Sequence, residues 1–170
     1  MKPMKPIILT LIGKDKPGLV ESLAQKVYSL GGNWLSSNFS YMAGHFAGFV
    51  EVDIPEDNHQ ILIDYLHKHP HLTIHSVSAD VDANQKSDIV EIDIMGNDKP
   101  GIVQELTSTL SRFNINIVKF ESSCQSAPNW GSLLFKAHAI VAIPEGFHLD
   151  ELSDALENIA NDLVVDVDLR

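Results

Sequence analysis

The feature that most constrains the fold of this chain is a nine-residue motif that occurs twice. Residues 12–20 read IGKDKPGLV and residues 95–103 read MGNDKPGIV, so six of the nine positions are identical. The two motifs lie 83 residues apart, as Gly13 and Gly96 show, and the same offset relates Asn33 to Asn116. A match sustained at one offset is typical of a duplicated structural unit. The chain is therefore predicted to contain two copies of one small domain.

The predicted boundaries are residues 1–82 for the first copy, 83–87 for a short polar linker and 88–170 for the second copy. Domains of this size bury only a modest fraction of their surface. We therefore expect the two copies to pack on each other or on another subunit, and a homodimer is the expected assembly.

Both copies show the same order of hydrophobic patterns. An apolar strand leads into the motif, and apolar residues at helical spacing follow it. A predicted hairpin, a second helix and a last strand complete each copy. The predicted α+β fold is two tandem βαββαβ ferredoxin-like domains, with antiparallel sheets, both helices on one face and the first and third strands at the centre. The later elements are expected at 34–41, 45–54, 58–68 and 72–81 in the first copy, and at 117–123, 133–143, 149–163 and 164–169 in the second.

Composition and charge exclude several classes of protein. The chain is 44% hydrophobic and 21% charged, as in ordinary globular proteins. Its single cysteine, Cys124, excludes an internal disulfide. A formal net charge of −11 with no basic segment argues against direct nucleic-acid binding. The apolar run at 7–12 is too short for a signal peptide or a membrane span. We expect a cytoplasmic protein with no membrane partner.

Enzymatic and metal chemistry find little support in the residues. None of the nucleotide-binding, zinc-protease or serine-hydrolase motifs is present, and no base or orienting group is paired with Cys124. Histidines cluster at His67, His69 and His71, but Pro70 interrupts them, and the second copy lacks them. The sequence therefore predicts no enzyme, cofactor or metal site. A small catalyst that uses Cys124 or the histidines is the least favoured alternative.

The duplicated Asp-Lys-Pro-Gly turn is the strongest candidate for a binding site. A turn that enters a helix presents unpaired backbone amides, which suit a carboxylate, and a glycine lets a ligand approach the backbone. An Asp oxygen could accept from an ammonium group, and an Asn beyond the helix could add a donor and an acceptor. Proline suits the first turn of the helix. Such residues also simply start helices, but their recurrence favours a ligand site or an interface.

With these motifs, the chain resembles the ACT domain, a small amino-acid-sensing module, over about 6–81 and 88–169. A pair of such domains with no catalytic or DNA-binding domain resembles the glycine cleavage system transcriptional repressors. That resemblance implies an accessory repressor that responds to glycine and acts through a DNA-binding activator protein. The alternative is a detached amino-acid-binding regulatory subunit of a metabolic enzyme, or a module like the N-terminal region of formyltetrahydrofolate deformylase.

The resemblance also implies which residues contact the ligand. Trp34 departs from the smaller aliphatic residue common at this position, whereas Ile117 does not, so the site of the first copy is expected to be partly filled. ACT pairs often build their sites by side-by-side packing of sheets, so two chains are expected to complete one site. The implied ligand contacts are Asp15, Pro17, Gly18, Leu19 and Asn33, and Asp98, Pro100, Gly101, Ile102 and Asn116.

Overall fold

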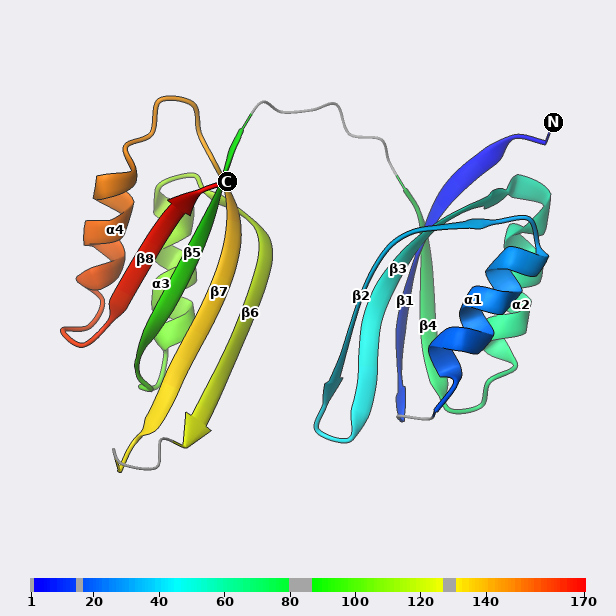
Figure 1. Cartoon of the computed structure of the whole chain (residues 1–170), viewed down its shortest axis with the longest axis horizontal. Coiled ribbons are helices and arrows are strands. Elements are labelled where there is room, and N and C mark those ends of the chain that lie inside the picture. Colours follow the sequence, from blue (N-terminus) through cyan, green and yellow to red (C-terminus); the bar gives the residue numbers. More distant parts are fainter. Residues whose placement is uncertain (1, 15–16, 80–86, 127–130) are drawn as a thin grey trace. The chain divides into compact units, whose positions relative to one another are not determined.

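The computed structural model contains all 170 residues, and the structure describes residues 2–14, 17–79, 87–126 and 131–170. The chain divides into two compact units, Met1–Ala83 (unit 1) and Asn84–Arg170 (unit 2), which are drawn in Figure 1. Most of the predicted linker lies outside the described residues, so its boundaries stay a prediction.

Unit 1 contains the predicted βαββαβ order. Its strand-to-helix turn follows β1, and shortly after α1 the chain turns at Gly31, a left-handed glycine of the kind that typically ends a helix. The last strand ends before the predicted limit, and Val81 lies outside the described residues. The elements are β1 Met4–Lys14, α1 Leu19–Ser29, β2 Asn33–Met42, β3 His45–Pro55, the short 3₁₀ helix η1 Glu56–Asn58, α2 His59–His67 and β4 Leu72–Ser78.

Unit 2 repeats this order without the 3₁₀ helix. Here α3 is followed by Asn114, a non-glycine residue with a positive φ of 57°, at the place where unit 1 has its glycine stop. The Ile-Pro-Glu triplets at 54–56 and 143–145 lie 89 residues apart rather than 83, so the sequence predicts six extra residues in the second hairpin, around 126–131. They fall mainly on residues that the structure does not describe. The elements are β5 Asp88–Asn97, α3 Ile102–Arg112, β6 Asn116–Ser126, β7 Leu133–Ile143, α4 Leu149–Glu157 and β8 Val164–Leu169.

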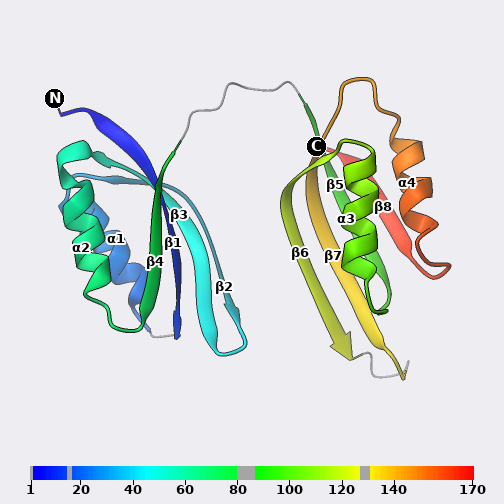
Figure 2. The same cartoon turned by 180° about the vertical axis from the view of Figure 1, so that it is seen from behind.

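Each unit forms one four-stranded antiparallel sheet with both helices on the same face (Figures 1 and 2). The strand orders are β2-β3-β1-β4 and β6-β7-β5-β8, so the first and third strands of each unit are central. These orders confirm the ferredoxin-like prediction. Both sheets leave their other face uncovered within the unit, and we call it the open face.

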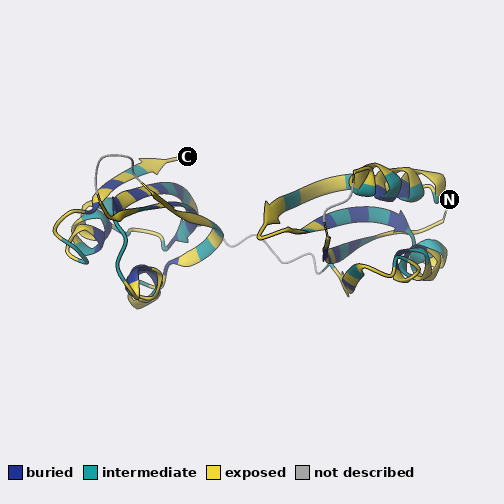
Figure 3. Cartoon of the chain, turned by 90° about the horizontal axis from the view of Figure 1, so that it is seen from below, coloured by how far each residue is buried: buried dark blue, intermediate teal, exposed yellow. Residues whose placement is uncertain are grey.

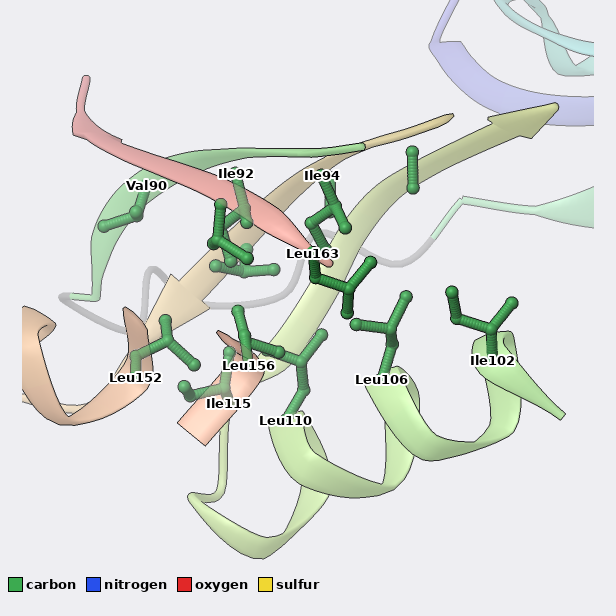
Figure 4. Close-up of a cluster of buried hydrophobic side chains, with 14 of the residues drawn as sticks. Val90, Ile92, Ile94, Ile102, Leu106, Leu110, Ile115, Leu152, Leu156 and Leu163 are labelled. Atoms are coloured by element: carbon green, nitrogen blue, oxygen red, sulfur yellow. The ribbon is translucent and has the colours of Figure 1, made fainter. Parts of the chain in front are cut away.

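Each core lies between the sheet and its two helices. Along β5, Val90, Ile92 and Ile94 are buried while the residues between them are not, which is the alternation expected of a sheet with one covered face. Figure 3 shows buried and exposed positions alternating along strands of the sheets. Leu106 and Leu110 of α3 point toward these strand residues in Figure 4. The matching cluster of unit 1 joins residues of β1, β3, β4, α1 and α2.

The second helix of unit 2 is shorter than predicted. The sequence places a helix over 149–163, because Ile159 and Leu163 continue the apolar spacing, but α4 ends at Glu157. Leu163 is nevertheless buried, because the turn after α4 carries it back onto the sheet. None of the helices in the described part of the chain is long and apolar enough to cross a membrane.

Candidate functional site

The two glycines of each motif have different structural roles. A Cβ on Gly13 would lie 2.5 Å from the carbonyl oxygen of His71, and one on Gly96 would lie 2.7 Å from Leu163 Cδ2. The first glycine therefore lets the end of the first strand pack against the turn before the last strand. Gly18 and Gly101 instead adopt left-handed φ values of 85° and 83°, and none of the described residues, apart from the immediate chain neighbours, lies within 4 Å of a Cβ placed there.

Gly18 and Gly101 are the N-cap residues of α1 and α3, and no side chain caps either helix. Pro17 and Pro100 therefore precede the helix, so their predicted place in the first helical turn is wrong. In unit 2 the amide of Ile102 donates to the carbonyl oxygen of Lys99, at 3.2 Å. Among the residues that the structure describes, no side chain therefore satisfies the first-turn amides at either helix start, which is the arrangement that favours an anion.

The turn of unit 2 is held by hydrogen bonds to the rest of the unit. The amide of Asn97 donates to Asp162 Oδ2, and the amide of Asp98 donates to the carbonyl oxygen of Leu133, both at 2.8 Å. Lys99 Nζ donates to Glu105 Oε2 and to the carbonyl oxygen of Ile159, both at 2.9 Å. The turn is therefore fixed to α3, to β7 and to the segment after α4. In unit 1, Asp15 and Lys16 lie outside the described residues.

Asp98 also has a neighbour that the sequence analysis missed. Its carboxylate lies near the thiol of Cys124, an exposed residue of the edge strand β6. Loss of hydration around the thiol and the interaction with the negatively charged Asp98 carboxylate raise the pKa of Cys124 above its usual value. A thiol with a raised pKa forms little thiolate near neutral pH, so it is poorly suited to nucleophilic catalysis.

The structure does not bring the predicted asparagines to the turns of their own units. In unit 2, Asn116 pairs with Ala142, which pairs with Ile89, whereas the turn follows Asn97 at the other end of β5. Eight residues of strand separate these ends by roughly 26 Å. In unit 1, Asn33 pairs with Asp53, which pairs with Pro6, again far from the turn. A single unit therefore cannot combine its turn and its asparagine around one small ligand.

The asparagine end of unit 2 carries a hollow of about 470 Å³. It lies between the C-terminal part of α3 and the start of β6, and Asn116 itself is exposed. Its polar groups are hydroxyls and amides, which can both donate and accept hydrogen bonds. The hollow is lined by Thr107, Ser111, Asn114, Ile115, Asn116 and Ile117.

Beside the turn of unit 1, aromatic residues fill the space under the helix. The rings of Phe39 and Phe46 stack with their centroids 5.0 Å apart, and the remaining cavity next to Leu19 is only about 10 Å³. Trp34, which the sequence analysis singled out, lies instead at the asparagine end and donates from Nε1 to Ser37 Oγ at 3.1 Å. The buried counterpart of Leu19 in unit 2 is Ile102.

The histidines near α2 are used structurally. The ring of His69 packs edge-on against Tyr65 with the centroids 5.2 Å apart, and the carbonyl of His71 lies next to Gly13. Among the described residues, no three or more His, Cys, Asp or Glu side chains are arranged to hold a metal ion.

Comparison with known families matches the chain to the ACT domain, over residues 5–75 and 88–124. Among solved structures, an unknown protein from Galdieria sulphuraria superposes with a TM-score of 0.87 at 23% identity, covering 99% of each chain. A candidate glycine cleavage system transcriptional repressor superposes with a TM-score of 0.66 at 18% identity, covering 98% of this chain and 99% of that one. No curated protein sequence matches the chain.

At such identities the two solved structures establish a shared fold. The family match goes further, because it spans more than half of the chain and includes the motif in both units. With its duplicated βαββαβ order and its two uncapped turns, this tandem protein belongs to the ACT domain family.

Proposed function

We propose that this protein is a non-catalytic, amino-acid-responsive regulator that represses the glycine cleavage system through a DNA-binding activator protein, with glycine as its effector. The observation that carries the proposal is the repeated turn: in both units, a helix start without a side-chain cap faces open space beside a left-handed glycine. Membership of the ACT domain family and the structural likeness to a candidate repressor of that system support it.

The chemistry of the turn suits a free amino acid. First-turn amides would receive the carboxylate, and an oxygen of Asp98 would accept from the ammonium group. The nearby Cys124 thiol leaves lone pairs of this carboxylate available, because a carboxylate offers about four acceptor sites. Asn116 would then contribute an amide donor and acceptor from the other side of the ligand.

Because Asp98 and Asn116 lie at opposite ends of unit 2, we propose that the site is completed between two units packed side by side. A two-fold arrangement would place the turn of one unit against the hollow beside Asn116 of the other. In such a pair, the turn of each unit would face Asn116 of the other unit, so two complete sites would form. The expected assembly is a homodimer in which unit 2 of each chain supplies half of each site.

Thermal unfolding of the full chain with each of the twenty amino acids tests effector binding. Glycine at a hundred times its dissociation constant should stabilise the protein by about 2.7 kcal/mol. Asp98→Asn and Asn116→Ala should each remove this shift, whereas Asp150→Asn, which removes an exposed carboxylate from α4, should leave it unchanged. If both single variants keep the full shift, the assignment of these residues to the site is wrong.

Mixing the two variants tests where the site is assembled. A mixed pair of Asp98→Asn and Asn116→Ala chains contains one site with both native groups, so an equal mixture should regain about a quarter of the sites. An equal mixture that regains nothing, although each variant is folded, would rule out assembly between the second units of two chains. Co-purification then identifies the partner: an activator that binds DNA supports the proposed role, and a biosynthetic enzyme would replace it.

A further inference from the structure

The open faces of the two sheets occupy equivalent positions but differ in chemistry. Strand pairing defines three rows of four residues on each open face, and none of these residues is buried. In unit 1 the rows contain one charged side chain, Glu51, which accepts a hydrogen bond from Ser36 Oγ at 3.1 Å. The rows of unit 1 are Ser36–Glu51–Ile8–Val77, Asn38–Phe49–Thr10–His75 and Ser40–Ala47–Ile12–Thr73.

The same twelve positions of unit 2 carry seven charged side chains and one histidine. Several form ion pairs in contact with water, such as Lys119 with Glu121 at 3.3 Å and His138 with Asp93 at 2.7 Å. The rows of unit 2 are Lys119–Ile140–Glu91–Asp168, Glu121–His138–Asp93–Asp166 and Ser123–Lys136–Met95–Val164.

Unit 2 therefore serves as an internal reference for how this sheet face looks when it is solvated. In unit 1 the same face exposes large apolar side chains: Phe49 is 50% exposed, Val77 is 61% exposed and Ile12 is 48% exposed. Their counterparts in unit 2 are His138, Asp168 and Met95. Several exposed large apolar side chains on one sheet face typically mark an interaction site.

We propose that the open face of unit 1 binds the open face of unit 1 in a second copy of this chain. The distribution of charge over the chain favours a second unit 1 face as the binding partner. The whole chain carries a formal charge of −11, so two copies repel over most of their surfaces. Burying the open face of unit 2 here would desolvate seven charges without matched partners, which is costly. The same twelve positions of a second unit 1 bring only one charge, and a two-fold axis makes the contact self-complementary.

The size of the face predicts how tight this contact is. Four strands spaced at about 4.8 Å and five residues along each strand cover roughly 300–400 Å² per copy. Stable interfaces bury about 800 Å² per partner, so we expect a weak dimer that depends on concentration. The contact joins two sheet faces about 10 Å apart. It is thus separate from the side-by-side pairing that the proposed function requires.

The test replaces residues of unit 1 with those that unit 2 carries at the same positions. The double variant Phe49→His and Val77→Asp introduces the residue types that unit 2 has at the equivalent positions, His138 and Asp168. The same fold therefore already contains both residue types at these positions. The control is Ile61→His, because Ile61 is 47% exposed but lies on α2, which covers the other face of the sheet. Circular dichroism and thermal unfolding establish that each variant is folded, and Val77→Asp alone replaces the double variant if it is not.

Sedimentation velocity of the full chain from about 5 to about 200 µM measures the association, over the range expected for a contact of this size. Any dimer formed through unit 2 should persist in all variants, so the test concerns association beyond it. The wild type and Ile61→His should show a further concentration-dependent association step that the double variant lacks. The proposal is wrong if the wild type shows no such further step, or if the double variant retains it. It is also wrong if the double variant keeps this further step but loses binding to a purified partner protein. The glycine response of the double variant should be intact, so this test is independent of the effector site.

Discussion

Gly101, the left-handed glycine of the unit 2 turn, should lose more stability when replaced by alanine than when replaced by asparagine. Gly101 has a φ of 83°, and nothing lies within 4 Å of an added Cβ, so the cost of Gly101→Ala is conformational. A left-handed residue with a Cβ costs about 1–2 kcal/mol. Reduced freedom of the unfolded chain returns about 0.4–1 kcal/mol, which leaves a net loss of about 1 kcal/mol.

Gly101→Asn should cost less than Gly101→Ala, although asparagine is larger, because asparagine tolerates the left-handed region. Asn114 of the same unit already adopts it, with a φ of 57°. The order should reverse at Gly96, where an added Cβ would lie 2.7 Å from Leu163 Cδ2 and 3.1 Å from the carbonyl oxygen of Asp162. There Ala should cost about 1–3 kcal/mol, and the larger Asn should cost more.

The four variants are compared by urea and thermal unfolding of the full chain. For a unit of this size, each 1 kcal/mol corresponds to a change of about 4–8 °C in Tm. The reasoning is refuted if Asn is worse than Ala at Gly101, because the constraint there would then be steric. It is also refuted if Asn is better than Ala at Gly96. A consequence for ligand studies is that valine at Gly101 would lower stability as well as binding.

Three further predictions concern unit 2. Lys99→Met should lower the free energy of unfolding by about 1 kcal/mol, because it removes two hydrogen bonds. Lys119→Met breaks an exposed ion pair and should lower the free energy of unfolding by no more than about half of that. Urea titration of both variants measures the two losses. The raised pKa of Cys124 leaves less thiolate at pH 8, so iodoacetamide should alkylate this residue more slowly than free cysteine. Asp98→Asn removes the nearby negative charge and should accelerate the alkylation. Equal alkylation rates in wild type and variant would contradict an interaction between Asp98 and Cys124. Leu156→Ala, at a fully buried position of α4, should cost about 2–5 kcal/mol in a calorimetric scan.

Most of the fold could be predicted from the sequence because the duplication supplies every pattern twice. The recurrence of the motif at one offset locates both turns, and the apolar spacing behind it locates α1 and α3. The end of α4 was not predictable from spacing, because Ile159 and Leu163 fit helical periodicity although they pack on the sheet from a turn. Periodicity reports which side chains face the core and not how the backbone brings them there.

The candidate site was only partly accessible from the sequence. The turn residues are contiguous, so their grouping could be predicted, but the asparagines are linked to them by a helix of eleven residues that runs the length of the sheet. Motif spacing does not reveal that this helix separates Asn116 from Asp98. The contact between Asp98 and Cys124 crosses the intervening strand β7, and no residue pattern in the sequence indicates it.

The difference between the two open faces also has an evolutionary consequence. Each copy keeps its buried core on the face that the helices cover, so substitutions on the other face leave the core of that copy intact. A chain that holds the same domain twice can therefore change the outer surface of one copy without altering the core of either. In this chain, duplication has left two sheets of the same topology with one charged side chain in one and seven in the other, at the same twelve open-face positions.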